Sequence, residues 1–303
     1  MIRRSILSLV LAFFAAQIGS RAEMNAAREI VRAPLRVAVL GFAQSSSGPR
    51  DLDQSIADAL ANALAAQGNL KLINQTLQRP ALRGVGYDGS INMSRDEARR
   101  VAAAVGCDFF ITGKTETLAR SEREGDTHIE AYAGVMIVDG RSGALAVFDF
   151  ALAKGREREA TASMLRDDLK SRAPLYSEKM GEYRAAQTGA VAGRADDQTI
   201  IDLPDAEAAF GAGFKPPEFL SRARPEYTGE AELADISATV EVLVVFSATG
   251  EIGRIELTRW AGFGLDESAG RAIKELKFKP ATRDGTAISV RALVRYNFRR
   301  TSQ

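Results

Sequence analysis

Strict alternation of apolar and polar side chains near the end of the chain is the feature that most constrains its fold. In residues 238–246 an apolar side chain recurs at every second position, at Val240, Val242, Val244 and Phe246. The same period recurs in residues 289–298, where the side chains predicted to point inward are Val290, Ala292, Val294, Tyr296 and Phe298. Because successive side chains of a strand point to opposite faces, this period predicts two half-buried β-strands.

The segments between these two strands predict the rest of a small domain. The turn residues 247–250 (SATG) lead into a second strand, residues 251–259, so that a hairpin is expected. After residues 262–266 (GFGLD) the spacing becomes that of a helix, with Asp266 as its expected N-cap and Ala269, Ala272, Ile273 and Leu276 on one side. Residues 277–281 end the helix and cross to the last strand. The predicted order is ββαβ.

This series resembles the TonB C-terminal domain over residues of about 222–298. The matching stretches are RPEYTGEA at the entry, SATGEIGRIEL in the hairpin, and AGFGLDESAGRAIKELKFKPATRDGTAISVRALVRYNF from the helix to the last strand. The segment GFGLDESAG is not a dinucleotide loop, because its helix follows a hairpin and no βαβ unit surrounds it. The resemblance implies a module that recruits partners and catalyses nothing.

The resemblance also implies where a partner binds. Domains of this type capture an extended peptide, the box at the start of an outer-membrane transporter, by adding it beside their last strand. On this sequence the predicted partner-binding residues are Ser289, Val290, Arg291, Leu293, Arg295, Asn297 and Arg299. The expected partner is an outer-membrane transporter or another envelope protein.

The end of the chain is strongly basic. Residues 271–303 contain nine basic and two acidic side chains, a net charge of +7. The basic residues are Arg271, Lys274, Lys277, Lys279, Arg283, Arg291, Arg295, Arg299 and Arg300. Two interpretations remain open: a surface that steers an acidic partner, and a solvated face whose arginines protect a strand edge from unwanted pairing.

Residues 35–187 predict a first domain with the order βαβαβββ. The expected strands are residues 35–42, 70–74, 107–117, 128–138 and 145–152. Helices are expected at residues 51–67 and after a capping box of Ser94 and Glu97, the latter helix ending at Gly106. Two more, residues 156–172 and 175–187, are interrupted at Pro174. The fold class is therefore α+β, with two domains.

The first domain carries a second resemblance, over residues of about 35–152. Its motifs are an early VAVLGF strand, a helix ending in VGCDFFITG, and a VDGRSGAL hairpin. They are similar to the N-terminal domain of the Tol-Pal translocation protein and to the related curli-secretion domain. The resemblance implies an envelope domain that supports assembly or protein contacts, and it transfers no activity to particular residues.

The ends of the two domains predict where the chain works and how they are joined. Arg3, Arg4 and the apolar run of residues 6–18 predict a signal peptide, residues 1–22, cleaved before Glu23. A periplasmic protein is expected, with inner-membrane association if the signal is retained. Residues 188–218, rich in Gly, Ala, Asp and Pro, are the expected linker. Within it residues 200–203 (IIDL) have the apolar character to dock on a neighbour.

Composition excludes several functions. Forty basic and 39 acidic residues leave no overall attraction to nucleic acid, which is not an expected partner. A single cysteine, Cys107, and a single histidine, His128, offer no multi-cysteine metal site and no supported catalytic triad. The glycines of residues 84–89 have no strand before them and no GKS or GKT after them, so they do not predict a phosphate loop. No cofactor or metal is expected.

Three hypotheses follow. The first is a TonB-like protein that binds an envelope partner through its last strand, in association with transmembrane transport. It departs from a full transducer, because the nine prolines are dispersed rather than gathered in a rod and the first apolar run is short. Recruitment is therefore favoured over energised import. The second hypothesis is a structural or assembly scaffold of the envelope, and the third, least supported, is an enzyme.

Overall fold

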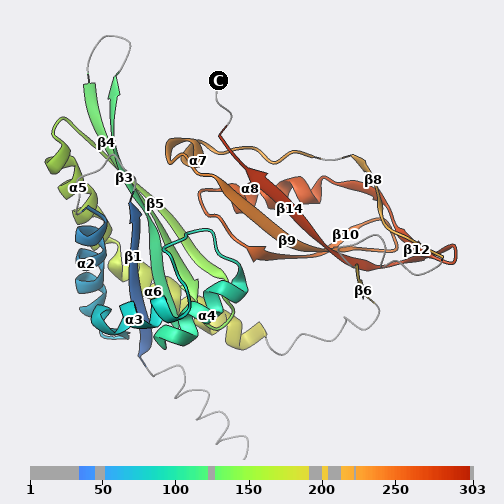
Figure 1. Ribbon diagram of the computed structural model, residues 1–303, viewed down its shortest axis with the longest axis horizontal. Coiled ribbons are helices and arrows are strands. Elements are labelled where there is room, and N and C mark those ends of the chain that lie inside the picture. Colours follow the sequence, from blue (N-terminus) through green and yellow to red (C-terminus); the bar gives the residue numbers. More distant parts are fainter. Residues whose placement is uncertain are drawn as a thin grey trace, which may run out of the picture.

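The computed structural model describes residues 34–44, 52–121, 127–190, 200–203, 213–221 and 223–300. The elements form two neighbouring regions, an N-terminal sheet covered by helices and a C-terminal sheet that carries helix α8 (Figure 1). This mixed architecture confirms the predicted α+β class. The expected signal peptide, residues 1–22, lies outside the described residues. Among the helices described, none combines the length and the apolar character needed to cross a membrane.

The N-terminal region is built on a five-stranded sheet in the order β2-β1-β3-β4-β5. Its strands are β1 (Leu35–Gln44), β2 (Leu70–Leu72), β3 (Phe109–Ser121), β4 (Thr127–Asp139) and β5 (Leu145–Gly155). Strand β1 is parallel to β2 and β3, whereas β3, β4 and β5 are antiparallel. The continuous apolar run of β1 is explained by burial on both faces, with Val37 and Val39 on one side and Ala38 on the other.

Helices α2 (Leu52–Ala65), α5 (Arg158–Ser171) and α6 (Ala173–Ala190) cover one face of this sheet. The side chains of α2 that recur every fourth residue, Ile56, Leu60 and Leu64, are fully buried there. The break between α5 and α6 falls at Arg172 rather than at Pro174. Proline is tolerated in the first turn of a helix because the N–H that it lacks would have no partner there.

Helices α3 (Gln75–Gly84) and α4 (Arg95–Val105) connect β2 to β3. Helix α4 has the predicted capping box of Ser94 and Glu97 and ends at Gly106 in the left-handed conformation. Helix α3 is an addition to the predicted elements. Its polar sequence and internal Pro80 hide the helical pattern, and Gly84 is its last residue.

The C-terminal sheet has the order β10-β9-β14-β6. Its strands are β9 (Ala238–Phe246), β10 (Ile252–Arg259), β14 (Val290–Phe298) and β6 (Ile201–Asp202), and α8 spans Leu265–Lys274. The predicted ββαβ order is confirmed, with a short helix α7 (Gly229–Leu233) before β9. One prediction is wrong in detail: the N-cap of α8 is Gly264, and Asp266 lies in the first turn.

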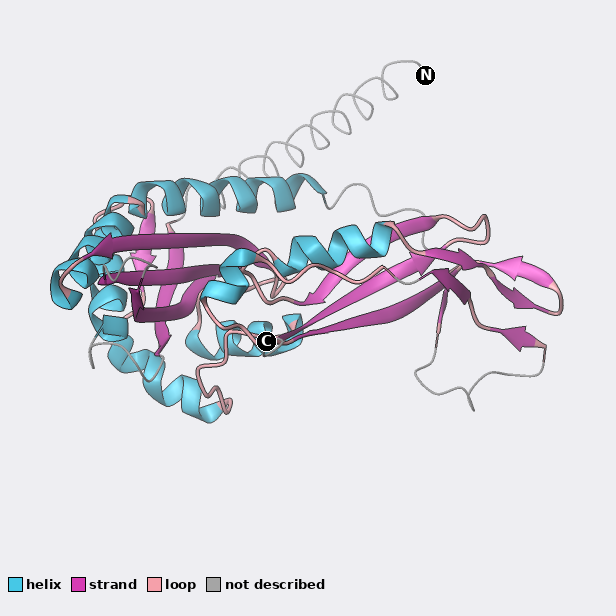
Figure 2. Ribbon diagram, turned by 90° about the horizontal axis from the view of Figure 1, so that it is seen from above, coloured by secondary structure: helices cyan, strands magenta, loops and turns pink. Residues whose placement is uncertain are grey.

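Five short strands form the crossover from α8 to β14 or pair with it. They lie at the end of the molecule farthest from the N-terminal sheet (Figures 1 and 2). They are β7 (Phe214–Lys215), β8 (Glu218–Ser221), β11 (Lys277–Lys279), β12 (Ala281–Arg283) and β13 (Thr286–Ile288). Strand β8 pairs with β11, and β12 pairs with both β7 and β13.

One hydrophobic core joins the two regions. It contains Phe110, Tyr132 and Met136 from the N-terminal sheet together with Trp260 and Phe263, which follow β10. All five side chains are fully buried. The C-terminal region and α4 thus cover the face of the N-terminal sheet that α2, α5 and α6 leave open.

Candidate functional site

Part of the outer edge of β14 has none of the described strands beside it. Strand β14 pairs with β9 along its whole length, from Val290 to Phe298, without a register shift. The backbone of Ser289 and Arg291 faces the other way, because their carbonyls accept hydrogen bonds from the N–H groups of Ile201 (3.2 Å) and Leu203 (2.8 Å). Since backbone groups alternate sides along an antiparallel strand, Leu293, Arg295 and Asn297 also face outward.

Among the described residues, β6 is the one strand on this edge, and it pairs with Val290 and Arg291. Within the described part of the chain, the outer edge of β14 is therefore paired at its beginning and unpaired from Leu293 onward. Leu293 is 40% exposed, which is unusual for a leucine in the middle of a strand. The outer edge that the described strands leave unpaired is thus shorter than β14.

A pocket of about 330 Å³ lies beside this edge. The side chains of Ala292, Val294 and Tyr296 face it from β14, while Leu203 lines it from the β6 segment. Across from them lie Pro216, Pro217, Phe219, Phe246 and Leu276, with the rings of Phe219 and Phe246 edge to face at 5.4 Å. A strand added next to residues 293–297 would direct every second side chain toward this apolar pocket.

The predicted partner-binding residues differ in what their side chains can do. Arg291 is bound to Asp202 at 2.6 Å, and Arg295 to Glu241 at 2.7 Å. Asn297 accepts a hydrogen bond from the Thr239 hydroxyl at 2.8 Å.

The other predicted residues lie at the two ends of the strand or in the core. Ser289 accepts a hydrogen bond from the Ala248 backbone N–H at 3.0 Å. Val290 is fully buried, and Arg299 is exposed just beyond the last residue of the strand. The backbone at Leu293, Arg295 and Asn297, rather than the full set of side chains, therefore forms the available surface.

The basic stretch at the end of the chain is partly neutralised by the fold. Among the described residues, four of its nine basic side chains form ion pairs with acidic residues from outside the stretch: Lys279 with Glu218, Arg291 with Asp202, Arg295 with Glu241, and Arg300 with Asp235. This arrangement favours the interpretation of a solvated, protected edge over that of a surface that steers an acidic partner.

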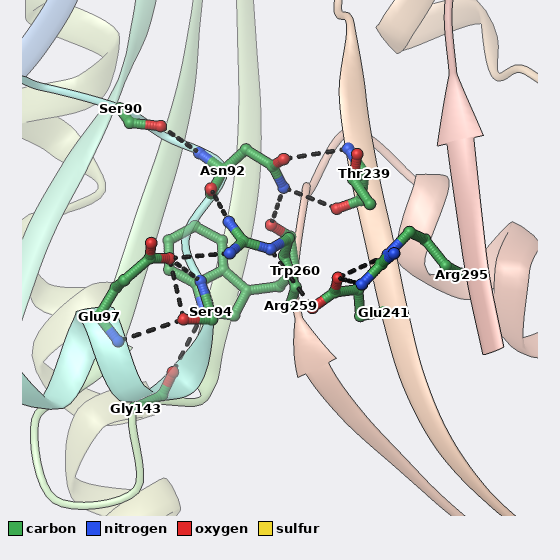
Figure 3. A network of polar contacts seen from close by, with 10 residues as sticks. All are labelled: Ser90, Asn92, Ser94, Glu97, Gly143, Thr239, Glu241, Arg259, Trp260 and Arg295. Carbon is green, nitrogen blue, oxygen red and sulfur yellow. Dashed lines mark hydrogen bonds and ion pairs between the residues drawn. The ribbon is translucent and has the colours of Figure 1, made fainter. Parts of the chain in front are cut away.

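The N-terminal region anchors the sheet that carries this edge (Figure 3). The side-chain amide of Asn92 donates to the carbonyls of Thr239 (2.9 Å) and Trp260 (2.7 Å) and accepts from the Thr239 N–H (3.0 Å). Asn92 thus takes the place of a strand residue next to β9, beyond the point where β10 ends. No sequence signal marks it, since it is a single asparagine in a loop 147 residues away from Thr239.

Arg259 and Trp260 continue this contact (Figure 3). Arg259 donates to the Asn92 carbonyl at 2.8 Å and forms ion pairs with Glu97 at 3.2 Å and Glu241 at 3.5 Å. The indole N–H of Trp260 donates to the Gly143 carbonyl at 3.1 Å. Since Glu241 also binds Arg295, a chain of polar contacts extends from α4 to β14.

The single cysteine and histidine are far from this edge in the fold. Cys107 is buried, and burial raises the pKa of its thiol to about 12. His128 lies 3.2 Å from the carboxylate of Glu130, which also pairs with Arg120 and Lys154. Within the described ranges no group of three or more His, Cys, Asp or Glu residues is arranged to hold a metal ion.

Several solved structures are similar to parts of the chain. The TonB CTD of Pseudomonas aeruginosa is 20% identical, with a TM-score of 0.26, and the match covers 31% of this chain and 94% of that chain. For the PelC dodecamer of Paraburkholderia phytofirmans the identity is 16%, the TM-score 0.29 and the coverage 46% and 88%. For the LpoB C-terminal domain of Salmonella enterica they are 15%, 0.28, and 41% and 84%.

No curated protein matches the sequence. The family of Gram-negative bacterial TonB protein C-terminal domains matches residues 223–299, which confirms the resemblance predicted for residues of about 222–298. The second resemblance, of the N-terminal domain, stays a prediction. Residues 223–299 of this chain are a TonB C-terminal domain.

Proposed function

We propose that the chain is a periplasmic TonB-like protein that binds an extended segment of an outer-membrane transporter by β-strand addition, in association with transmembrane transport. The observation that carries this proposal is the edge of β14 at Leu293, Arg295 and Asn297, which no described strand pairs with and which has an apolar pocket beside it. Backbone pairing supplies affinity for any extended segment, and the pocket selects among side chains. The periplasmic location rests on the expected signal peptide and on the domain family.

The energetics favour weak, reversible binding. Three outward-facing residues can form about six hydrogen bonds with a guest strand, each contributing ~1 kcal/mol net. Association itself costs ~4 to 15 kcal/mol. Burial of an apolar guest side chain in the pocket adds ~2 kcal/mol. At the lower cost of association these contributions leave about 4 kcal/mol, so we expect weak binding in the millimolar range.

We propose binding rather than catalysis because neither candidate reactive group is suited to chemistry. The raised pKa of the Cys107 thiol keeps it protonated and therefore a poor nucleophile at neutral pH. His128 is held by Glu130, which is itself surrounded by cations. Both lie on the N-terminal sheet or next to it, away from the edge of β14.

A structural scaffold of the envelope is the second candidate, and the shared core of the two regions favours it. Removal of residues 219–303 would expose Phe110, Tyr132 and Met136, so such a truncation would test folding as much as function. A single substitution on the edge separates the two candidates. A variant that loses partner capture but keeps its localisation and phenotype would favour the scaffold.

Site-specific photo-crosslinking in cells tests the proposal. A benzophenone side chain at position 293 is expected to form an adduct with the periplasmic N-terminal segment of an outer-membrane transporter, identifiable by mass spectrometry. Arg295→Pro in the same chain is expected to abolish the adduct. Proline removes an outward-facing N–H, which a guest strand needs and the ladder with β9 does not use.

Two controls make this result specific. The same crosslinker at Arg254, on β10 at the opposite edge of the sheet, is expected to give no such adduct. Circular dichroism of the Arg295→Pro chain is expected to match that of wild type. An adduct whose yield is unchanged by Arg295→Pro would contradict strand addition at this edge.

A further inference from the structure

We propose that strand β6 is an internal competitor for the partner strand, so that residues 201–203 of the predicted linker regulate access to the edge of β14. This inference rests on the proposed function. Strand β6 lies beside the first residues of β14 (Figure 1), and the backbone N–H groups of Ile201 and Leu203 occupy the carbonyls of Ser289 and Arg291. A guest strand that pairs along the whole of β14 needs the same groups.

The side chains of residues 201–203 already follow the pattern that a guest strand must have. In the parallel pairing Ile201 lies opposite Val290, and Asp202 lies opposite Arg291. Ile201 therefore packs against the core, Asp202 binds the guanidinium of Arg291 at 2.6 and 2.9 Å, and Leu203 lines the pocket. An apolar, an acidic and an apolar side chain thus contact the core, Arg291 and the pocket in turn.

The attachment of β6 is weak enough to be reversed. The strand has two residues, and the side chain of Asp202 is 70% exposed, so that water screens its ion pair with Arg291. A full-length guest strand makes more backbone hydrogen bonds than β6 does. It therefore displaces β6. The apparent Kd of the guest strand then equals its intrinsic Kd divided by the fraction of molecules in which β6 is detached.

Occupancy by β6 also shortens the edge. While it is bound, a guest strand can pair with Leu293, Arg295 and Asn297 but not with Arg291. Leu203 then forms one end of the pocket. Detachment of β6 and Leu203 would open the pocket at that end and add the outward-facing groups of Arg291 to the site.

The first experiment measures the attachment itself through a disulfide. The Asp202→Cys/Arg291→Cys chain is expected to oxidise readily, since paired residues of adjacent strands lie about 5 Å apart. The native Cys107 does not interfere, because it is buried. The matched control, Asp202→Cys/Arg295→Cys, places the second thiol further along the same face, beyond disulfide reach, and is expected to oxidise much more slowly.

The second experiment measures competition. The probe is a synthetic, uncharged heptapeptide that alternates valine and threonine, titrated into the full chain and followed by NMR. Its Kd is expected to be about tenfold higher for the oxidised Asp202→Cys/Arg291→Cys chain than for the reduced one. Asp202→Arg, which repels Arg291, is expected to lower Kd about tenfold relative to wild type, whereas the conservative Asp202→Glu leaves it within twofold. Because the probe is uncharged, attraction to the new arginine cannot produce this effect.

Leu293→Pro distinguishes failure of this inference from failure of the proposed function. Equal Kd values for the oxidised, reduced and Asp202→Arg chains, with binding lost in Leu293→Pro, would overturn competition by β6 and leave strand addition intact. Binding that is unaffected by Leu293→Pro, or absent from every form including Asp202→Arg, would overturn strand addition at β14 and the inference with it. Slow oxidation of the 202/291 pair, equal to that of the 202/295 control, would overturn the attachment.

Discussion

At the scale of single residues, the contact between the two regions depends on Gly134, which has no side chain. Phe263 stands between Gly262 and Gly264, and all three residues have positive φ angles. A phenylalanine in this conformation is strained by ~1 to 2 kcal/mol. Its ring compensates by packing on Phe148, at 4.9 Å between centroids, and by lying over Gly134 of β4.

Gly134→Ala is expected to destabilise the protein by ~1 to 3 kcal/mol. A Cβ at this position would lie 2.5 Å from the Cζ atom of Phe263, and the buried ring has little room to move. Urea unfolding measures the effect. The matched control is Gly68→Ala, where an added Cβ has no neighbour within 4 Å and a change below ~0.5 kcal/mol is expected. Equal stabilities of the two variants would contradict this account of Phe263.

At this scale the sequence could predict the turn but not its role. The glycines of GFGLD indicate a tight entry into a helix, as the structure has it. That the phenylalanine between them fills a space above Gly134 depends on two positions 129 residues apart, which no local pattern connects. The same holds for Asn92, whose amide replaces a strand residue beside Thr239.

At the scale of elements, the start of α8 contains a buried carboxylate. Asp266 accepts hydrogen bonds from the N–H groups of Ala261 and Gly262, both at 2.9 Å. Burial outweighs these bonds and raises the pKa of Asp266 to about 7. Between pH 4 and pH 7 the unfolded chain therefore loses this proton while the folded chain retains it, so the contribution of Asp266 to stability falls as pH rises.

Comparison with Asp266→Asn isolates this contribution, because asparagine does not titrate. The unfolding free energy of wild type minus that of Asp266→Asn is expected to decrease from pH 4 to pH 7, by ~4 kcal/mol at most, and to level off above pH 7. Denaturant unfolding at a series of pH values measures it. A difference that is constant over this range, or that increases with pH, would contradict the raised pKa.

The elements differ in how far their sequences determine them. Capping residues and regular apolar spacing predicted α4 and β9, where local preference and burial agree. The sequence does not predict helix α3, because Pro80 and its polar residues hide the helical pattern that packing imposes. For β6 the apolar character of residues 200–203 indicated docking, but its site on β14 is a tertiary contact that a two-residue strand cannot specify locally.

At the scale of the whole molecule, the sequence predicts two domains and a linker, but it does not predict the core that the two regions share. Trp260 and Phe263 follow β10 in the TonB C-terminal domain, yet they are buried against the N-terminal sheet. From the sequence alone they are two aromatic residues near a helix entry. The edge of β14 is therefore presented by a two-domain body rather than by a small domain on a flexible tether.

A single cooperative unfolding transition is the consequence of this shared core. Trp260 is the sole tryptophan of the sequence and lies at the contact between the regions, so its fluorescence reports their separation. In urea its midpoint is expected to coincide with that of far-UV circular dichroism. Asn92→Ala removes three hydrogen bonds across the contact, and the Thr239 N–H and carbonyl lose their partner. It is expected to lower the free energy of unfolding by ~1 to 3 kcal/mol and to shift both midpoints together to lower urea. A change in fluorescence at lower urea than the change in circular dichroism would mean that the regions separate before they unfold, and the edge would then be carried by an independent domain.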